Sequence, residues 1–224
     1  MITASKGGIG KSVLTWMLAE KYRDALILDL DIATKTTTRQ LAYRKPILVS
    51  FLDPITKRID RSAFNGLFES VAETEKEIFI ADLSGAVSQQ LPEYFKTHGP
   101  GTVAAILTSL EIDLQIVCVI GGENEFKTTM EYLVELRESV GQHFKVIAAH
   151  NLKTPFTRSQ QEEFFAYHRQ TPGIYATYDL VKDKGEGAMK VAAEVLQAGK
   201  GQEGLSPFKA IYFNPLSILN DESD

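Results

Sequence analysis

The sequence is poor in cysteine and has no excess of positive charge. Cys118 is the one cysteine among 224 residues, which excludes a disulfide or a thiolate-ligated metal site within one chain. The net charge of −5 gives no general attraction to nucleic acid or to an anionic membrane, although a local basic patch remains open. No apolar stretch reaches the length of a membrane span, and the first residues lack the pattern of a signal peptide. We therefore expect a cytoplasmic protein.

The composition is typical of a folded globular protein. Hydrophobic residues make up 44% of the chain and charged residues 24%, and a chain of this length can bury most of its apolar surface without disulfides or metals. No internal repeat, low-complexity segment or clear linker divides it. We expect one domain over residues 1–224, with 220–224 as a frayed tail.

Short apolar runs alternate with segments of helical periodicity. Strand-like runs occupy residues 2–5, 25–30, 78–83, 114–120, 145–149 and 173–180, and a further apolar run lies at 46–52. Helical patterns cover residues 13–22, 60–72, 125–140, 157–169 and 185–198, and one or two more helices lie in 85–110 around a Gly-Pro-Gly break. Asp60 or Ser62 is expected to cap the helix that ends near residue 72. This alternation indicates an α/β fold, with a mostly parallel sheet and helices on both faces.

A glycine-rich segment, Ser5 to Ser12, joins the first strand-like run to the first helical pattern. Its spacing matches the end of G-x-x-x-x-G-K-[ST], with Ser5 in place of the first glycine. Glycines let such a loop turn its N–H groups toward an anion, and the following helix directs its positive end there. The predicted phosphate-binding residues are Gly7, Gly8, Ile9, Gly10 and Lys11, and the Ser12 hydroxyl is placed to hold Mg²⁺. The structural alternative is a glycine-rich turn that binds nothing.

The position after Ser12 is not assigned to the nucleotide site. No equivalent of a binding serine is predicted at position 13, because the sequence has Val13 there. Val13 instead begins the mostly apolar helical pattern of residues 13–22.

Two later strand-like runs end in aspartates. Asp82 closes the run 78–83, as in a Walker B strand whose carboxylate holds Mg²⁺ through water. Asp29 and Asp31 close the run 25–30, and their spacing places both on one face of a strand. Because ligands gather at the carboxyl ends of parallel strands, we expect all three carboxylates beside the glycine-rich loop. The alternatives are that Asp29 caps the next segment and that Asp82 is structural. The hydroxyl-rich residues 34–38 are expected to form a mobile switch loop.

The strand-like run 145–149 leads into His150 and Asn151. An asparagine amide has both a donor and an acceptor, so Asn151 is predicted to meet the N6 and N7 edge of adenine. A guanine site usually shows Asn-Lys-x-Asp, and Thr154 stands in place of that Asp, so ATP is favoured over GTP. We expect His150 to be a strand-end histidine with its hydrogen bonds satisfied.

A second lysine at the front of the loop, Lys6, completes the pattern K-G-G-x-G-K-S. This pattern resembles the deviant Walker A loop of the ParA/MinD family of ATPases, which have a P-loop NTPase-type sandwich fold. The resemblance also covers the D-x-D pair, the Walker-B-like strand and Asn151, all within residues 1–151. The chain departs from the family in having Ile32-Ala33 where Pro-Gln is frequent and Ser84-Gly85 where a proline usually follows the aspartate.

The resemblance implies roles for individual residues. In that family the front lysine crosses a dimer interface and touches the nucleotide of the partner subunit, which implies the same for Lys6. Asp31 would orient the attacking water, and Asp29 would lie near Mg²⁺ and Lys11. Together Lys6, Lys11 and Asp31 form the implied catalytic set, and Ser12, Asp82 and Asp29 form the implied metal set. ATP and Mg²⁺ are the implied cofactors.

The implied activity is ATP hydrolysis by an ATP-dependent homodimer that acts as a switch. In the family such switches serve plasmid or chromosome partition, conjugative transfer or cargo positioning, with a ParB-like activator and, in some members, non-specifically bound DNA. The lysines that could contact DNA here are interrupted by acids, so a solvated helix face is favoured (Lys182, Lys184, Lys190 against Asp183, Glu186, Glu194). The acidic end of the chain argues against a MinD-type membrane anchor, and the single cysteine does not fit the iron–sulfur relatives.

Three alternative functions remain open from the sequence. One is a MinD-like positioning ATPase, and another is a degraded relative that binds nucleotide without hydrolysing it. The third is a metabolic P-loop enzyme, a synthetase or kinase that transfers the γ-phosphoryl group to a small molecule. This enzyme would require a substrate pocket beside the phosphate, and the sequence shows no residues for one.

Overall fold

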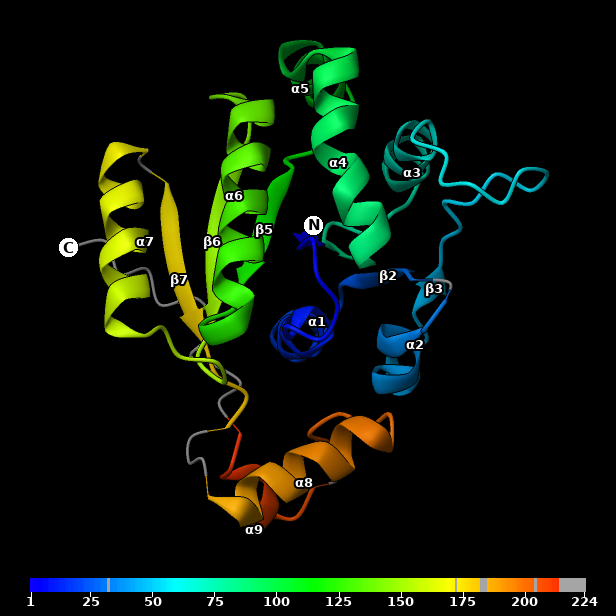
Figure 1. Ribbon diagram of the computed structural model, residues 1–224. Helices are drawn as coiled ribbons and strands as arrows, with labels where there is room; N and C mark the ends of the chain where they lie inside the picture. Colours follow the sequence, from blue (N-terminus) through cyan, green and yellow to red (C-terminus); the bar gives the residue numbers. More distant parts are fainter. Residues whose placement is uncertain (32, 172, 182–184, 204, 214–224) are drawn as a thin grey trace.

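One parallel sheet organises the fold in the computed structural model, which describes residues 1–31, 33–171, 173–181, 185–203 and 205–213 (Figure 1). Within these ranges the sheet has seven strands in the order β3-β2-β4-β1-β5-β6-β7, and every neighbouring pair is parallel. The strands are β1 (Ile2–Thr3), β2 (Leu26–Leu30), β3 (Ile47–Leu48), β4 (Phe79–Leu83), β5 (Gln115–Ile120), β6 (Lys145–Asn151) and β7 (Ile174–Tyr178). The predicted α/β class, a parallel sheet with helices on both faces, is confirmed, and the arrangement is consistent with a P-loop NTPase-like sandwich.

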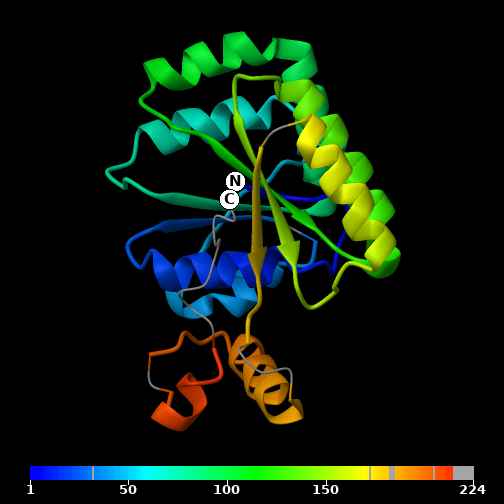
Figure 2. The same cartoon turned by 90° about the vertical axis from the view of Figure 1, so that its left-hand side faces the viewer.

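Helices connect the strands and cover both faces of the sheet. They are α1 (Lys11–Lys21), α2 (Thr36–Gln40), α3 (Ala63–Ala72), α4 (Gly85–His98), α5 (Pro100–Ser109), α6 (Phe126–Val140), α7 (Arg158–Gln170), α8 (Glu186–Gln197) and α9 (Pro207–Ala210), with short 3₁₀ turns η1 (Ala42–Arg44) and η2 (Glu123–Glu125). Figure 2 shows α1 and α2 beneath the sheet, with α8 and α9 furthest below, and the longer helices α4, α6 and α7 on the opposite side.

Two apolar cores lie on the two faces of the sheet. Because side chains alternate along a strand, Ile116, Cys118 and Ile120 of β5 join one core, and Val117 and Val119 join the other. The first core is completed by side chains from α3 to α7, and the second by side chains from α1 and α8. A strand buried on both faces needs apolar residues at successive positions, which is the pattern that β5 shows.

Several element boundaries differ from those expected. Within the apolar run 46–52, only β3 pairs with the sheet, and its side chains are half exposed because β3 lies at the edge. The Ser62 side chain does not cap α3; instead the Asp60 carboxylate accepts from the Ser62 N–H at 2.9 Å, before the helix begins. Between α4 and α5 the chain breaks at Gly99, whose φ of 77° favours glycine, as the Gly-Pro-Gly sequence predicted. The expected tail, 220–224, lies outside the described residues.

The Cys118 thiol is expected to be unreactive in the folded protein. Its side chain is fully buried in the centre of β5, and burial raises the pKa of the thiol to about 12. Since the thiolate is the reactive form, its reaction with a disulfide reagent at pH 8 should be slower than that of an exposed cysteine by roughly a thousandfold or more. A Ser50→Cys, Cys118→Ala double variant provides the exposed reference, since Ser50 is exposed. After unfolding in guanidinium, Cys118 and the cysteine introduced at position 50 should react at equal rates. Fast labelling of Cys118 in the native protein would contradict its burial in β5.

Within the residue ranges given above, no helix is both long enough and apolar enough to span a membrane.

Candidate functional site

The glycine-rich loop lies at the centre of the sheet, between β1 and α1. β1 pairs with β4 on one side and with β5 on the other, so the chain crosses over β1 when it passes from β4 to β5. Ligands in open α/β sheets bind outside the carboxyl ends of the strands at such a reversal of strand order. The register places Asp29 of β2 directly opposite Asp82 of β4. The glycine-rich loop and two of the predicted carboxylates therefore share one edge of the sheet.

Two positive φ angles shape the loop. Gly8 has φ 81° and Gly10 has φ 103°, a region that L side chains rarely adopt. A Cβ on Gly10 would lie 2.4 Å from Nδ2 of Asn151 and 2.7 Å from the Tyr178 hydroxyl. The Asn151 amide donates to the Ile9 carbonyl at 2.9 Å, so the ends of β6 and β7 form a rear wall that supports the loop.

Asn151 uses its polar atoms within the protein. Besides the bond to Ile9, its Oδ1 accepts from the Lys153 N–H at 3.0 Å, and the residue is 7% exposed. The predicted contact with adenine would have to replace these bonds, and it stays a prediction. His150 is bonded as expected: its ring nitrogens lie 3.2 Å from the Tyr175 hydroxyl and 3.1 Å from the Thr154 carbonyl oxygen.

Lys11 lies folded over the loop at the first position of α1. Its side-chain amine donates to the Lys6 carbonyl at 2.9 Å, and the residue is only 8% exposed. Burial lowers the pKa of this amine, while the nearby carboxylates of Asp82 and Asp31 act in the opposite direction. The buried Lys11 amine has one main-chain acceptor, so it can form further hydrogen bonds to an anion such as phosphate.

Position 13 contributes no polar group to the site. The chain has Val13 at this position, so the serine next to Lys11 that could bind a cofactor is not repeated at position 13. The Val13 side chain is partly buried and packs against the core that α1 and α8 complete. The hydroxyl that the start of α1 directs to Asp82 is therefore that of Ser12.

Asp82 gathers two hydroxyls on one carboxylate oxygen. Its Oδ2 accepts from Ser12 at 2.8 Å and also from Thr37, while its Oδ1 is buried with no hydrogen-bond partner in the described part of the chain. Burial raises the pKa of Asp82 to about 6, although the hydrogen bonds from Thr37 and Ser12 and the charge of Lys11 oppose that shift. A carboxylate oxygen left unsatisfied beside a serine hydroxyl fits a hard cation such as Mg²⁺.

Within the described residues, no larger metal-binding group accompanies this pair. Across the described residues, no three histidine, cysteine or carboxylate side chains come together in a way that could hold a metal ion. A cation at Ser12 and Asp82 would therefore need further oxygens from other side chains, from water or from phosphate.

Asp29 and Asp31 both bind the segment that follows β2. Asp29 is fully buried, and its Oδ2 accepts from the N–H and the hydroxyl of Thr38, each at 2.7 Å. The Asp31 carboxylate is closer to the surface and accepts from the N–H groups of Ala33 and Thr34 at 3.1 and 3.0 Å. The geometry of Asp29 matches the capping alternative, and the metal and water roles of these two aspartates stay predictions.

The segment expected to be a mobile loop is in part helical. α2 begins at Thr36, within the predicted switch residues 34–38, and Thr37 is 1% exposed. The hydrogen bonds to Asp29 and Asp82 explain this difference, because they pull the hydroxyl-rich segment onto the sheet edge. Sequence patterns missed Thr37 as a member of the site, since its contact with Asp82 joins two distant parts of the chain.

Lys6 forms an ion pair within its own chain, with Glu125 of η2. Both side chains are partly exposed, at 46% and 28%. Glu125 was not among the predicted residues, although its position just after β5 places it at the same sheet edge. The turn that carries it is held by Gln160, whose side chain accepts from the Glu123 N–H at 2.9 Å and donates to the Glu123 carbonyl at 2.7 Å.

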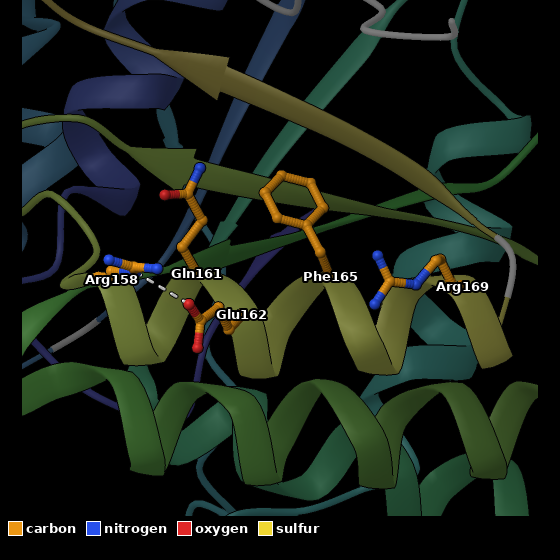
Figure 3. Close-up of a pocket in the computed structure, with 5 residues that line it drawn as sticks. All are labelled: Arg158, Gln161, Glu162, Phe165 and Arg169. Atoms are coloured by element: carbon orange, nitrogen blue, oxygen red, sulfur yellow. Dashed lines mark hydrogen bonds and ion pairs between the residues drawn. The ribbon is translucent and has the colours of Figure 1, made fainter.

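Two surface hollows lie away from this edge. One, of about 390 Å³, lies along α7 and is lined by the five side chains in Figure 3, where Arg158 donates to Glu162 at 3.1 Å. Another, lined mainly by apolar side chains, lies between α3, α4 and α5. Neither hollow is lined by the loop residues 5–12, so neither serves as a phosphate-adjacent substrate pocket.

The lysines considered for DNA contact are only partly described. Lys182 and Lys184 lie outside the described residues, and Lys190 lies on α8. On the same helix Glu194 forms an ion pair with Lys209 at 3.7 Å.

Comparison with known proteins assigns this chain neither a family nor a function. No protein-family model and no curated protein matches the chain. Among solved structures, it is similar to a plasmid partition protein from Borrelia burgdorferi, with 11% sequence identity and a TM-score of 0.46. The match covers 88% of this chain and 95% of that chain. A likeness of this extent does not assign a function.

Proposed function

We propose that this protein binds ATP with Mg²⁺, hydrolyses the γ-phosphate and acts as a nucleotide-dependent homodimeric switch. One observation carries the proposal: Ser12, at the end of the glycine-rich loop, donates to the buried Asp82, whose second oxygen has no partner among the described residues. The same loop has the sequence of a phosphate-binding loop with a second lysine.

In this proposal, the residues of the site bind the phosphates, hold the cation and orient the water. The N–H groups of the loop and the Lys11 amine bind the phosphates, and Ser12 with Asp82 holds the cation, Asp82 through water. When bound, Mg²⁺ neutralises charge that develops on the phosphates. Asp31 orients the attacking water from the rim of the site, where it is partly exposed. Asp29 supports the neighbouring segment rather than the phosphates themselves. Hydrolysis of this type depends on positioning and electrostatics, and these groups supply both kinds of effect.

Lys6 links nucleotide binding to dimerisation in this proposal. It would leave Glu125 and reach the nucleotide of the partner subunit, so that two bound nucleotides join two chains. The ion pair with Glu125 is partly exposed, and such pairs contribute only about 0–1 kcal/mol, so a phosphate can replace the carboxylate at small cost. A ParA-like role in partition or cargo positioning, a ParB-like activator and DNA belong to the same proposal.

Sedimentation with ADP or a non-hydrolysable ATP analogue tests this function. We expect a monomer with ADP and a dimer with the analogue. Lys6→Ala should raise the dimer dissociation constant by about tenfold or more, because charge-assisted contacts to phosphate contribute about 1.5–3 kcal/mol, while nucleotide binding by the monomer stays unchanged. Lys127→Ala is the matched control, since Lys127 is exposed on the nearby α6.

A second variant separates the ion pair from the dimer contact. Glu125→Gln removes the competing carboxylate, so it should leave the dimer intact or tighten it by a few-fold. A wild-type protein that stays monomeric with the analogue would contradict the switch, and phosphoryl transfer from that monomer to a metabolite would favour the kinase or synthetase alternative.

A further inference from the structure

One side chain connects α2 with the Asp82 carboxylate. The Thr37 hydroxyl donates to Oδ2 of Asp82, the same atom that accepts from Ser12 at 2.8 Å. Thr37 is 1% exposed and Asp82 is 4% exposed, so this contact is closed to bulk water. Through Thr37, the short helix α2 is therefore in direct contact with the predicted metal site.

The two hydrogen bonds to Asp82 leave oxygen lone pairs on the donating hydroxyls, and these lone pairs can bind a cation. A hydroxyl has one hydrogen to donate and two lone pairs, and both Ser12 and Thr37 use that hydrogen in a hydrogen bond to Asp82. Their lone pairs therefore remain available as acceptors or ligands. Oδ1 of Asp82 is buried without a hydrogen-bond partner in the described part of the chain, which is an independent sign that the cluster is incomplete. Hydroxyl and carboxylate oxygens are the donors that Mg²⁺ prefers.

Asp29 fixes the position from which Thr37 acts. Two bonds of 2.7 Å join Oδ2 of Asp29 to the N–H and the hydroxyl of Thr38, the next residue of α2. Asp29 lies opposite Asp82 in the register of β2 and β4. The two neighbouring carboxylates therefore bind two successive threonines, which holds the Thr37 hydroxyl at the site without help from a ligand.

We propose that Thr37 contributes a third protein oxygen, beside Ser12 and Asp82, to the environment of the Mg²⁺, and that α2 thereby senses the metal–nucleotide complex. The inference rests on the proposed function, since the cation enters with the nucleotide. α2 packs against α8 on its other side, so a change in α2 has a neighbour on which to act. Lys35 and Arg39 are exposed at the two ends of this short segment and provide cleavage sites for trypsin.

The first test uses the wild-type protein with ADP, in Mg²⁺ or in EDTA. Cleavage after Lys35 and Arg39 should slow by about tenfold or more when Mg²⁺ and ADP are both present, and by much less with ADP in EDTA. Equal protection in both conditions would overturn the proposal, because α2 would then respond to nucleotide alone. Failure of wild-type protein to bind ADP with or without Mg²⁺ would instead contradict the proposed function.

The second test compares hydroxyl variants. Thr37→Val keeps the shape of the side chain and should raise the Mg²⁺ concentration for half-maximal binding of a fluorescent ADP by about ten- to a hundredfold, with ADP affinity in EDTA unchanged. Thr37→Ser should restore the wild-type value, and Thr36→Val, which changes an exposed hydroxyl bond to Thr34, is the matched control. An unchanged or tighter Mg²⁺ dependence in Thr37→Val would refute the role of Thr37. If Thr37→Val does not fold, Thr37→Ala takes its place in the same titration, and the cleavage experiment still tests whether α2 responds to Mg²⁺.

Discussion

Lys11→Met is expected to weaken ATP binding by roughly a hundred- to a thousandfold. The Lys11 amine is buried against the loop and has one main-chain acceptor, so in the proposed complex it gains bonds to two phosphates. Charge-assisted hydrogen bonds contribute about 1.5–3 kcal/mol each, and two of them account for a change of this size. Isothermal titration calorimetry with a non-hydrolysable analogue measures the affinity directly.

Stability without nucleotide should change little in the same variant. Burial penalises the Lys11 cation, and this cost opposes what its single hydrogen bond and the attraction of Asp82 contribute, so we expect only a small change in the free energy of unfolding. Lys21→Met, at the other end of α1, is the control for both measurements. Wild-type affinity in Lys11→Met would contradict a phosphate at this loop, whatever its stability.

Gly10→Ala is expected to lower the free energy of unfolding by about 2–4 kcal/mol. A residue with a Cβ at φ 103° is strained by about 1–2 kcal/mol, and the new methyl group would overlap the Asn151 amide and the Tyr178 hydroxyl. Relieving that overlap displaces Asn151 from the Ile9 carbonyl, which adds about 1–2 kcal/mol. Denaturant unfolding, followed by the fluorescence of Trp16, reports the change.

Gly7→Ala is the matched control for this experiment. A Cβ on Gly7 would meet nothing within 4 Å, and its φ lies outside the positive region, so its free energy of unfolding should stay within about 0.5 kcal/mol of wild type. Equal stability of the two variants would show that Asn151 and Tyr178 do not form the rear wall of the loop. Since the comparison needs no nucleotide, it tests the loop geometry separately from the proposed function.

The sheet could be predicted because its signals are local. Apolar runs that end at Leu30, Leu83 and Ile120 mark strands that are buried on both faces, and the structure ends them at the same residues. The loop was predictable because three glycines, a lysine and a serine at fixed spacing have few other uses. β3 was less well delimited, since an edge strand is set by its pairing with β2 and not by its own sequence.

Side-chain contacts across the sheet edge were beyond sequence reasoning. The bond between Thr37 and Asp82, and the ion pair between Lys6 and Glu125, each join residues that adjoin different strands. No local pattern encodes such contacts, because they depend on which strands become neighbours and in what register. The hydroxyl-rich stretch was therefore predicted as a mobile loop, although burial of Thr37 beside Asp82 makes part of it a helix.

The central position of β1 affects how the protein is made. This two-residue strand comes before its hydrogen-bonding neighbours β4 and β5, which begin at Phe79 and Gln115. During translation, the glycine-rich loop therefore leaves the ribosome long before the strands that fix it exist, and it must wait for β5 to emerge. Such long-range pairing slows folding and leaves apolar segments uncovered meanwhile. Fragments truncated before Gln115 should thus be bound by chaperones or aggregate, even though they contain every residue of the loop.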